Sequence, residues 1–405
     1  MKSGWPTKSL GQLCQLISGQ HIQAKDYNTE SRGVGYLTGP SDFGPLNPVI
    51  SKWTEHPKVK AKCGDVLITV KGSGVGKINL LDQAEVAISR QLMAVRVTGA
   101  DPRFVHAILS STFDHFQSLS TGAAIPGISR EQVLGLKIAL PPFPEQQRIV
   151  GILNAAFDGI ATATVNAEKN LHNARALFES HLQSVFTQRG EGWVETMLGS
   201  EVDLLAGFAF KSVQYTDSAD SVRLLRGDNI VQGSLRWDDV KNWLKSDTSG
   251  YSRYQLCEGD VVLAMDRPWV KAGLKHAMIS GADLPCLLVQ RTARLRSCPK
   301  IESRFLMFLI GSGEFTRHIL GVQTGIGVPH ISGQQIQDFR FFRPPLREQR
   351  RIADNLESLR DLTQRLESIY RQKLAALDEL KKSLLHQAFS GQLTRDKGEL
   401  IRENG

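Results

Sequence analysis

The sequence lacks the features of a secreted, membrane-embedded or metal-binding protein. Its five cysteines are scattered and no Cys-x-x-Cys pair occurs, so neither a disulfide framework nor a zinc site is supported. No continuous apolar run approaches the roughly 20 residues of a membrane span. Met1–Pro6 lacks the apolar core of a signal peptide. We therefore expect a cytoplasmic protein that does not enter a membrane and holds no metal.

Motifs of catalytic chemistry are also missing. In the glycine-rich segment Lys71–Lys77, a phosphate-binding loop would need glycine in place of Lys71 and Ser or Thr in place of Ile78. Leu140–Phe143 is similar to the Asn/Asp-Pro-Pro-Tyr/Phe motif of adenine-N6 methyltransferases, but Leu140 replaces the required amide or acid. No His-Glu-x-x-His or Gly-x-Ser-x-Gly pattern occurs. We predict a chain that is not an enzyme by itself and has no catalytic residues.

What the sequence does contain is an internal repeat whose most regular part is a long helical pattern. Pro141-Pro142 followed by Glu145–Ile149 recurs as Pro344-Pro345 followed by Glu348–Ile352, 203 residues later. The prolines can precede a helix, and the glutamate lies in its first turn, where the helix dipole favours an anion. The offset stays constant along the pattern, which predicts two helices of equal length.

Apolar residues recur every three or four positions along both helical patterns. A pattern of about 40 residues spans roughly 60 Å, which is too long for one globular core to bury. We therefore expect the two apolar stripes to pack on each other as a coiled-coil-like pair. The residues predicted at this helix-pair interface are Ile149, Leu153, Ala156, Ile160, Leu177, Ile352, Leu356, Leu359, Leu366, Leu377 and Leu380.

One equivalent pair, Asn170 and Lys373, falls where a heptad places apolar residues. Either this polar pair fixes the register of the helices, or the neighbouring Leu171 and Leu374 take the seam and the polar residues face outward. We favour the second alternative.

The repeat extends through the rest of the chain. Gly4-Trp5 recurs as Gly192-Trp193, and Gly64–Val66 recurs as Gly259–Val261, at offsets of 188 and 195 residues. Insertions and substitutions therefore concentrate in the middle of each half. Two copies of one scaffold that recognise different targets would diverge in this way, and loop drift without function is the alternative.

Each half also shows mixed strand and helix patterns. Strands are expected at 66–70 and 92–97 with a helix at 104–119, and then at 261–265 and 287–290 with a helix at 304–320. The predicted segments are a globular domain at 1–143, a helix at 144–188, a second domain at 189–346, a second helix at 347–390 and a tail at 391–405.

The net charge of +8 is compatible with a nucleic-acid partner without demanding one. Arg, Asn and Gln have the bidentate geometry that base edges require, and several lie at predicted loops or strand ends near the divergent middles. For any one of them, a solvated surface residue is the alternative. The candidate DNA-binding residues are Arg32, Lys71, Ser73, Lys77, Arg90, Gln91, Arg223, Arg226, Asn229, Arg267, Trp269, Lys271 and Arg291.

The two copies of Pro-Pro-x-x-Glu-Gln-x-Arg-Ile before long helices resemble the DNA-specificity (S) subunit of a type I restriction–modification system. The two Thr-Gly-x-x-x-Pro-x-Ile-Ser segments, the two Gly-Asp-Val strands and Phe389–Thr394 resemble that family as well. The resemblance implies an α+β fold. It consists of two globular α/β-mixed target-recognition domains, separated by two long antiparallel coiled-coil helices and related by a pseudo-two-fold axis.

The same resemblance implies the partners. Each domain would recognise one half of a split, asymmetric site in double-stranded DNA, and the helices would set the gap. Two modification subunits would dock on this chain, bind S-adenosylmethionine and methylate adenine. A restriction subunit that uses ATP and Mg would complete the system, and this chain itself would need no cofactor.

Three other interpretations stay open. The chain could be a coiled-coil scaffold with two protein-binding heads, or a specificity subunit that works with methylation alone. A self-contained DNA-modifying enzyme is the third, and it would need a catalytic motif that this sequence does not show.

Overall fold

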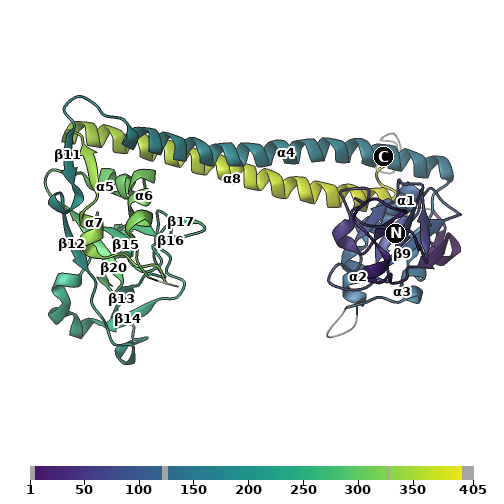
Figure 1. Ribbon diagram of the computed structural model, residues 1–405, viewed down its shortest axis with the longest axis horizontal. Helices are drawn as coiled ribbons and strands as arrows, with labels where there is room; N and C mark the ends of the chain where they lie inside the picture. Colours follow the sequence, from purple (N-terminus) through teal and green to yellow (C-terminus); the bar gives the residue numbers. More distant parts are fainter. Residues whose placement is uncertain (1–4, 121–125, 326–327, 395–405) are drawn as a thin grey trace, which may run out of the picture. The chain divides into compact units, whose positions relative to one another are not determined.

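The computed structural model describes residues 5–120, 126–325 and 328–394 of the chain (Figure 1). The chain forms two compact units: unit 1 comprises Met1–Glu168 and Gln372–Gly405, and unit 2 comprises Lys169–Arg371. The boundaries fall inside two long helices, α4 (Phe143–Thr187) and α8 (Leu346–Ser390). Each unit therefore contains a globular part and one stretch of each helix, whereas the segments predicted from the sequence end where the helices end.

Both long helices have 45 residues, as the constant offset predicts. The glutamine of the repeated Glu-Gln pair is buried at each helix start. Gln146 accepts a hydrogen bond from the backbone N–H of Asp101 at 2.8 Å and donates one, also at 2.8 Å, to the carbonyl of the first proline. Gln349 makes the corresponding bonds with Glu302 and its own proline, at 2.8 Å each. Each long helix is thereby tied to the globular part of its unit.

In unit 1, the start of α4 packs against the end of α8. Ile149 and Leu153 share one buried cluster with Leu385 and Ala388. Farther along, the ammonium group of Lys381 lies 5.4 Å from the centre of the Phe157 ring. Because α4 residues of increasing number meet α8 residues of decreasing number, the two stretches are antiparallel.

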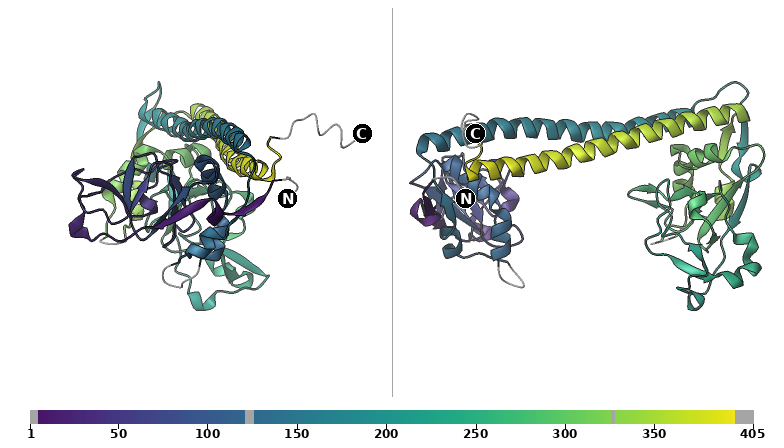
Figure 2. Two further views of the ribbon diagram at one scale, coloured as in Figure 1. Left: turned by 90° about the vertical axis from the view of Figure 1, so that its right-hand side faces the viewer. Right: turned by 180° about the vertical axis from the view of Figure 1, so that it is seen from behind.

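In unit 2, the end of α4 packs against the start of α8 in the same sense. Leu182 shares a buried cluster with Ile352 and Leu356, and Arg175 pairs with Glu367 at 3.0 Å. The two helices run beside each other within each unit, as the views from the side and from behind show (Figure 2).

The predicted interface residues do not all face this seam. Ile149, Leu153, Ile352 and Leu356 are buried. Half-buried positions are Ala156, Ile160, Leu359, Leu366 and Leu377.

The prediction is wrong for Leu177 and Leu380, which were expected at the interface but are 52% and 47% exposed. Instead Leu171 and Leu374 are half-buried, and the polar residue directly before each of them is exposed. An α-helix repeats every 3.6 residues, so residues spaced strictly seven apart gradually rotate away from the contact face. A four-residue step in the apolar pattern returns the next apolar residue to that face. The step from buried Ala167 to Leu171 is such a correction.

The globular part of unit 1 has two four-stranded sheets, ordered β2-β9-β6-β7 and β4-β3-β8-β5, and a small β1-β10 pair. The expected helix at 104–119 is broken at Thr112 into α1 and α2. The elements are β1 (Thr7–Ser9), β2 (Cys14–Ser18), β3 (Val34–Leu37), β4 (Trp53–Thr54), β5 (Lys60–Lys62), β6 (Val66–Thr69), β7 (Ile78–Leu80), β8 (Glu85–Ile88), β9 (Leu92–Val97), α1 (Pro102–Ser111), α2 (Phe113–Leu119), α3 (Arg130–Leu134) and β10 (Lys137–Ala139).

Unit 2 repeats this order, with sheets β12-β20-β15-β18 and β14-β13-β19, a β11-β21 pair and an added β16-β17 hairpin. The expected helix at 304–320 is broken at Gly311-Ser312. The elements are β11 (Val194–Met197), β12 (Val202–Ala206), β13 (Ser221–Leu225), β14 (Lys241–Leu244), β15 (Val261–Ala264), β16 (Trp269–Val270), β17 (Gly273–Leu274), β18 (His276–Met278), β19 (Cys286–Leu288), β20 (Thr292–Ser297), α5 (Ser303–Ile310), α6 (Gly313–Val322), α7 (Gly333–Gln337) and β21 (Arg340–Arg343).

The repeated Gly-Asp-Val sequence begins the most buried strand of each unit. Asp65 pairs with Arg96 through two hydrogen bonds of 3.0 and 2.8 Å, and Asp260 pairs with Arg296 through two of 2.7 and 2.8 Å. A bidentate pair fixes the aspartate and arginine strands in register. All four side chains of the following strand are buried in both units.

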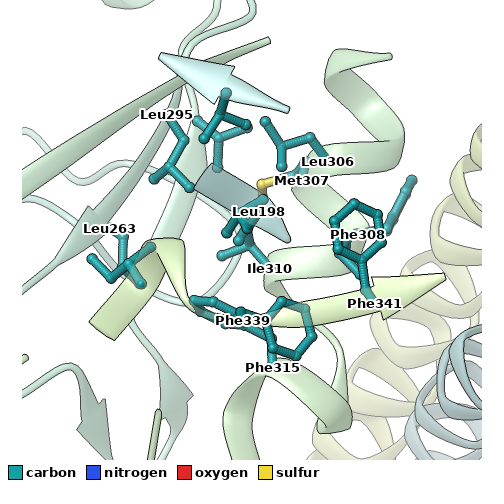
Figure 3. Packing of buried hydrophobic residues seen from close by; sticks show 14 of the residues in the cluster. Leu198, Leu263, Leu295, Leu306, Met307, Phe308, Ile310, Phe315, Phe339 and Phe341 are labelled. Atoms are coloured by element: carbon teal, nitrogen blue, oxygen red, sulfur yellow. The ribbon is translucent and has the colours of Figure 1, made fainter. Parts of the chain in front are cut away.

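The largest core lies in unit 2 (Figure 3). Strand residues Leu263 and Leu295 face Leu306 and Phe308 of α5, and Phe315 of α6 packs edge-on against Phe339 with ring centres 5.1 Å apart. In unit 1, Val66 and Ile68 of β6 join one cluster and Leu67 joins another, because successive strand residues point to opposite faces. The middle strand therefore carries cores on both sides.

Of the described helices, α4 alone is long and apolar enough, by length and composition only, to cross a membrane. Its large apolar residues Ile149, Leu153 and Leu182 pack in the two cores. Packing against protein therefore accounts for these three apolar residues.

Candidate nucleic-acid interface

In unit 1, four loop segments meet at one end of the core strands. They are residues 38–40 after β3, 71–77 after β6, 89–91 before β9, and 126–127, and we call them the loop cluster of unit 1. Val70 N–H donates to the carbonyl of Gln91 at 2.8 Å, and Gly72 N–H donates to that of Pro126 at 2.9 Å. The Ser89 hydroxyl donates to the carbonyl of Thr38 at 2.5 Å. Backbone contacts thus hold together segments that are far apart in the sequence.

Glycine is needed where residues 71–77 approach the segment after β3. A Cβ on Gly74 would lie 2.6 Å from the Pro40 ring. Gly72 and Gly76 have φ values of 93° and 82°, which side chains rarely adopt. The glycine-rich segment is therefore a tight turn fitted into the cluster.

The loop cluster of unit 1 contains five of the predicted DNA-binding residues, all exposed: Lys71, Ser73, Lys77, Arg90 and Gln91.

Arg32 does not belong to this cluster. It precedes β3, at the strand end opposite residues 38–40, and its exposed guanidinium pairs with Glu30 at 2.7 Å.

The equivalent segments of unit 2 are residues 226–229, 266–275, 290–291 and 328–330, and we call them the loop cluster of unit 2. Met265 N–H donates to the carbonyl of Arg291 at 2.9 Å, and Arg267 N–H donates to that of Pro329 at 2.7 Å. The first bond has the same place as the one between Val70 and Gln91 in unit 1. The same arrangement of strands in both units, which we call the frame, therefore carries two different sets of loop residues.

The β16–β17 hairpin gives the loop cluster of unit 2 a surface of its own. It displays Trp269, which is 41% exposed, together with exposed Arg267 and Lys271. Burial lowers the pKa of half-buried Lys275, and the nearby positive charges of Arg236 and Arg267 lower it further. The region is rich in cations beside an exposed aromatic ring, a combination suited to nucleic acid.

Asp266 links two residues of the loop cluster of unit 2. Its carboxylate pairs with the guanidinium of Arg291, and its other oxygen lies 2.5 Å from Nδ1 of His330. Burial raises the pKa of Asp266, but the bonds from Arg291 and His330 outweigh it and hold the pKa below its ordinary value. Asp266 and His330 are not among the residues predicted from the sequence, since neither residue type stands out as a base-contacting residue.

Three predicted DNA-binding residues of unit 2 make contacts within their own domain. Asn229 is 2% exposed, accepts from Arg226 N–H at 3.1 Å and donates to the Arg236 carbonyl at 3.0 Å. The Arg226 side chain pairs with Asp239 at 2.8 Å. Arg223 lies over the ring of Trp237 and donates to the Ala282 and Leu284 carbonyls. A sequence pattern does not distinguish a free guanidinium from one already bonded within its domain.

Within residues 5–120, 126–325 and 328–394, no group of three or more His, Cys, Asp or Glu side chains is arranged to hold a metal ion. The repeated Thr121-Gly122 segment lies outside the described residues.

One family profile matches the N-terminal part of the chain, most of which lies in unit 1. Residues 2–171 match the sequence profile described as the type I restriction modification DNA specificity domain. The first part of this chain is therefore similar to a type I DNA specificity domain. The specificity subunit of the Escherichia coli type I restriction enzyme EcoAI is 39% identical over 170 residues, which span 42% of this chain but only 28% of that subunit.

Similarity to specificity subunits also extends along the chain. The MjaVIII specificity subunit of Methanocaldococcus jannaschii is 25% identical over 405 residues, covering 96% of this chain and 93% of that subunit. A chain solved in work on complex assembly and conformational transition of the type I R-M system has a TM-score of 0.77 at 19% identity, covering 97% of this chain and 99% of that chain. These comparisons confirm the resemblance and the fold class predicted from the sequence.

Lys71 and Lys77 provide a test of the loop cluster of unit 1 as a DNA-binding surface. In the complex with a modification subunit, Lys71→Ala and Lys77→Ala should each weaken binding to all DNA sequences about equally. Each should also lower the slope of log affinity against log salt by about 0.9, because one phosphate contact and its released counterion are lost. Fluorescence anisotropy over a salt series measures both effects.

Arg32→Ala is the matched control, since Arg32 is also exposed but lies outside the cluster, and it should change neither quantity. Wild-type slopes for both lysine variants would exclude the loop cluster from the DNA contact.

Proposed function

We propose that this chain is the DNA-recognition subunit of a type I restriction–modification complex, in which each unit recognises one part of a bipartite, asymmetric site. The observation that carries this proposal is the pair of loop clusters, built on the same strands but carrying different residues. Gln91 and Arg291 occupy equivalent turns before β9 and β20, and Lys71 and Asp266 occupy equivalent positions after β6 and β15.

Different side chains at equivalent places imply different base contacts. Glutamine has the bidentate geometry for adenine and arginine has that for guanine. A duplicated frame with unlike loops therefore fits a target whose two parts differ. The equal long helices fit a spacer between the parts, at about 3.4 Å of duplex per base pair.

The modification partner is proposed to bind the long helices. Leu177 and Leu380 are repeat-equivalent and exposed, although both are large apolar residues. Two equivalent apolar positions suit two copies of one partner. The methyl donor S-adenosylmethionine would belong to that partner, and ATP and Mg would belong to a restriction subunit, so the chemistry would lie outside this chain. Because the target is chromosomal DNA, we place the complex in the cytoplasm.

A scaffold with two protein-binding heads is the competing function. It accounts for the helix pair but gives no reason for exposed lysines and arginines to gather on the loop cluster of each unit. The distinction is experimental, because only the recognition subunit changes which adenines are methylated.

The direct test is a genome-wide map of adenine methylation in cells that carry the modification partner, with and without this chain. We expect one gapped, asymmetric, two-part motif that disappears when the chain is deleted. An unchanged map, with the partner expressed and co-purifying with the chain, would contradict the recognition role and favour the scaffold.

The partner surface has its own test. Leu177→Asp with Leu380→Asp should abolish co-purification of the modification subunit while leaving the melting temperature within a few degrees, because neither side chain is buried. Thr162→Asp with Arg365→Asp, exposed on the same two helices, serves as the control. Normal co-purification of the leucine double variant would remove these positions from the docking surface.

A further inference from the structure

The backbone at Arg291 is held in an unusual conformation. Its φ is 64°, in the left-handed region that residues with side chains rarely occupy. The turn is fixed on both sides, since Met265 N–H donates to the Arg291 carbonyl at 2.9 Å and Gln290 N–H donates to the Phe208 carbonyl at 2.7 Å. Such conformations persist where the surrounding structure imposes them, and they are concentrated at functional sites. The surrounding backbone therefore fixes the direction in which the Arg291 side chain leaves the main chain.

The Arg291 side chain is also held at one edge only. Its NH1 nitrogen bonds to Asp266, and among the described residues this is the hydrogen bond that its guanidinium makes. The Arg291 side chain is 65% exposed, whereas that of Asp266 is 20% exposed. An arginine has five donors in a rigid fork, so Nε and NH2 have no hydrogen-bond partner among the described residues.

Asp266 is itself fixed. One oxygen bonds to Arg291, the other lies 2.5 Å from His330 Nδ1, and the backbones of Asp266 and His330 form an antiparallel bridge. A carboxylate bonded through both oxygens cannot rotate without losing a partner. Arg291, Asp266 and His330 thus form a chain of three residues in which the arginine is the most exposed, with 65% of its side chain accessible against 43% for His330 and 20% for Asp266.

The chemistry of this chain favours a base edge over a phosphate. A carboxylate beside the guanidinium reduces the net positive charge and would repel a phosphate. It does not impair a bidentate pair of N–H donors, which matches the O6 and N7 acceptors of guanine in the major groove. Unit 1 has no such carboxylate at the equivalent place, because Lys71 stands where unit 2 has Asp266.

From this geometry, and resting on the proposed function, we propose that Arg291 recognises a guanine in the half-site bound by unit 2. Asp266, held by His330, is the positioning residue that aims its guanidinium. The two half-sites then differ at this equivalent turn because the aimed arginine occurs in unit 2 alone.

The experiment selects bound DNA from a library randomised across the wild-type half-site of unit 2, using the complex of this chain with its modification subunit. Wild-type complex should select guanine at one position, and Arg291→Gln should reduce that preference by about 5- to 150-fold while leaving the other positions unchanged. Asp266→Ala should reduce the same preference at the same position. Melting temperatures establish that each variant is folded.

A double-variant cycle separates positioning from a general structural role. If Asp266 acts through Arg291, Asp266→Ala should have no further effect on base preference when Arg291→Gln is already present. Arg317→Gln is the matched control, since Arg317 is an exposed arginine paired with Glu314 outside the loop cluster, and it should change no position.

Two results would overturn the inference and leave the proposed function standing. One is a motif in which Arg291→Gln changes no position. The other is a uniform loss of affinity with a smaller salt slope, which would make Arg291 a phosphate contact. A wild-type complex that selects no motif would instead overturn the proposed function together with this inference.

Discussion

Each half of this molecule depends on one buried side-chain amide, that of Gln146 in unit 1 and of Gln349 in unit 2. They are 3% and 0% exposed, and each bonds both to the backbone before its long helix and to the start of a helix in the globular part. Leaving a buried polar group without its partner costs roughly 1–3 kcal/mol. The long helix therefore leaves the globular part in one fixed direction, and the Pro-Pro-x-x-Glu-Gln motif of both halves has a structural reason.

Above that fixed junction, the strands form a frame that is the same in both units. The aspartates of the two Gly-Asp-Val sequences pair with arginines of β9 and β20 through equivalent bidentate bonds. The frame brings together four loop segments at one strand end, and loop residues there change without disturbing the cores. The hairpin that carries Trp269 in unit 2 and the glycine turn of residues 71–77 in unit 1 occupy the same place in the frame. Divergence is therefore concentrated in the loops that we propose to contact the target and not in the residues that hold the fold.

The sequence predicted the regular parts of the structure best. A constant offset between two copies is a strong signal, and it predicted two long helices of equal length, while residue patterns predicted two of the strands in each unit. The heptad placed Leu177 and Leu380 at the seam, which was wrong, because the true helical repeat drifts from seven residues. The single helices expected at 104–119 and 304–320 are each broken by a turn. For the site, residue type alone made Lys71, Gln91, Arg267 and Arg291 candidates for DNA contact. It did not show that Asn229 is buried or that Asp266 bonds to Arg291, since those facts depend on loops that meet only in the folded chain.

The central claim is that one frame, used twice, recognises two different DNA sequences through its loops. The most direct measurement is the methylation motif of a variant in which residues 1–140 replace residues 189–343, so that both halves carry the loop cluster of unit 1. The account predicts an assembled complex that methylates a symmetric site, with two inverted copies of the half-site recognised by unit 1. An assembled complex that keeps the asymmetric wild-type motif would contradict it, because recognition would then not reside in the loop clusters.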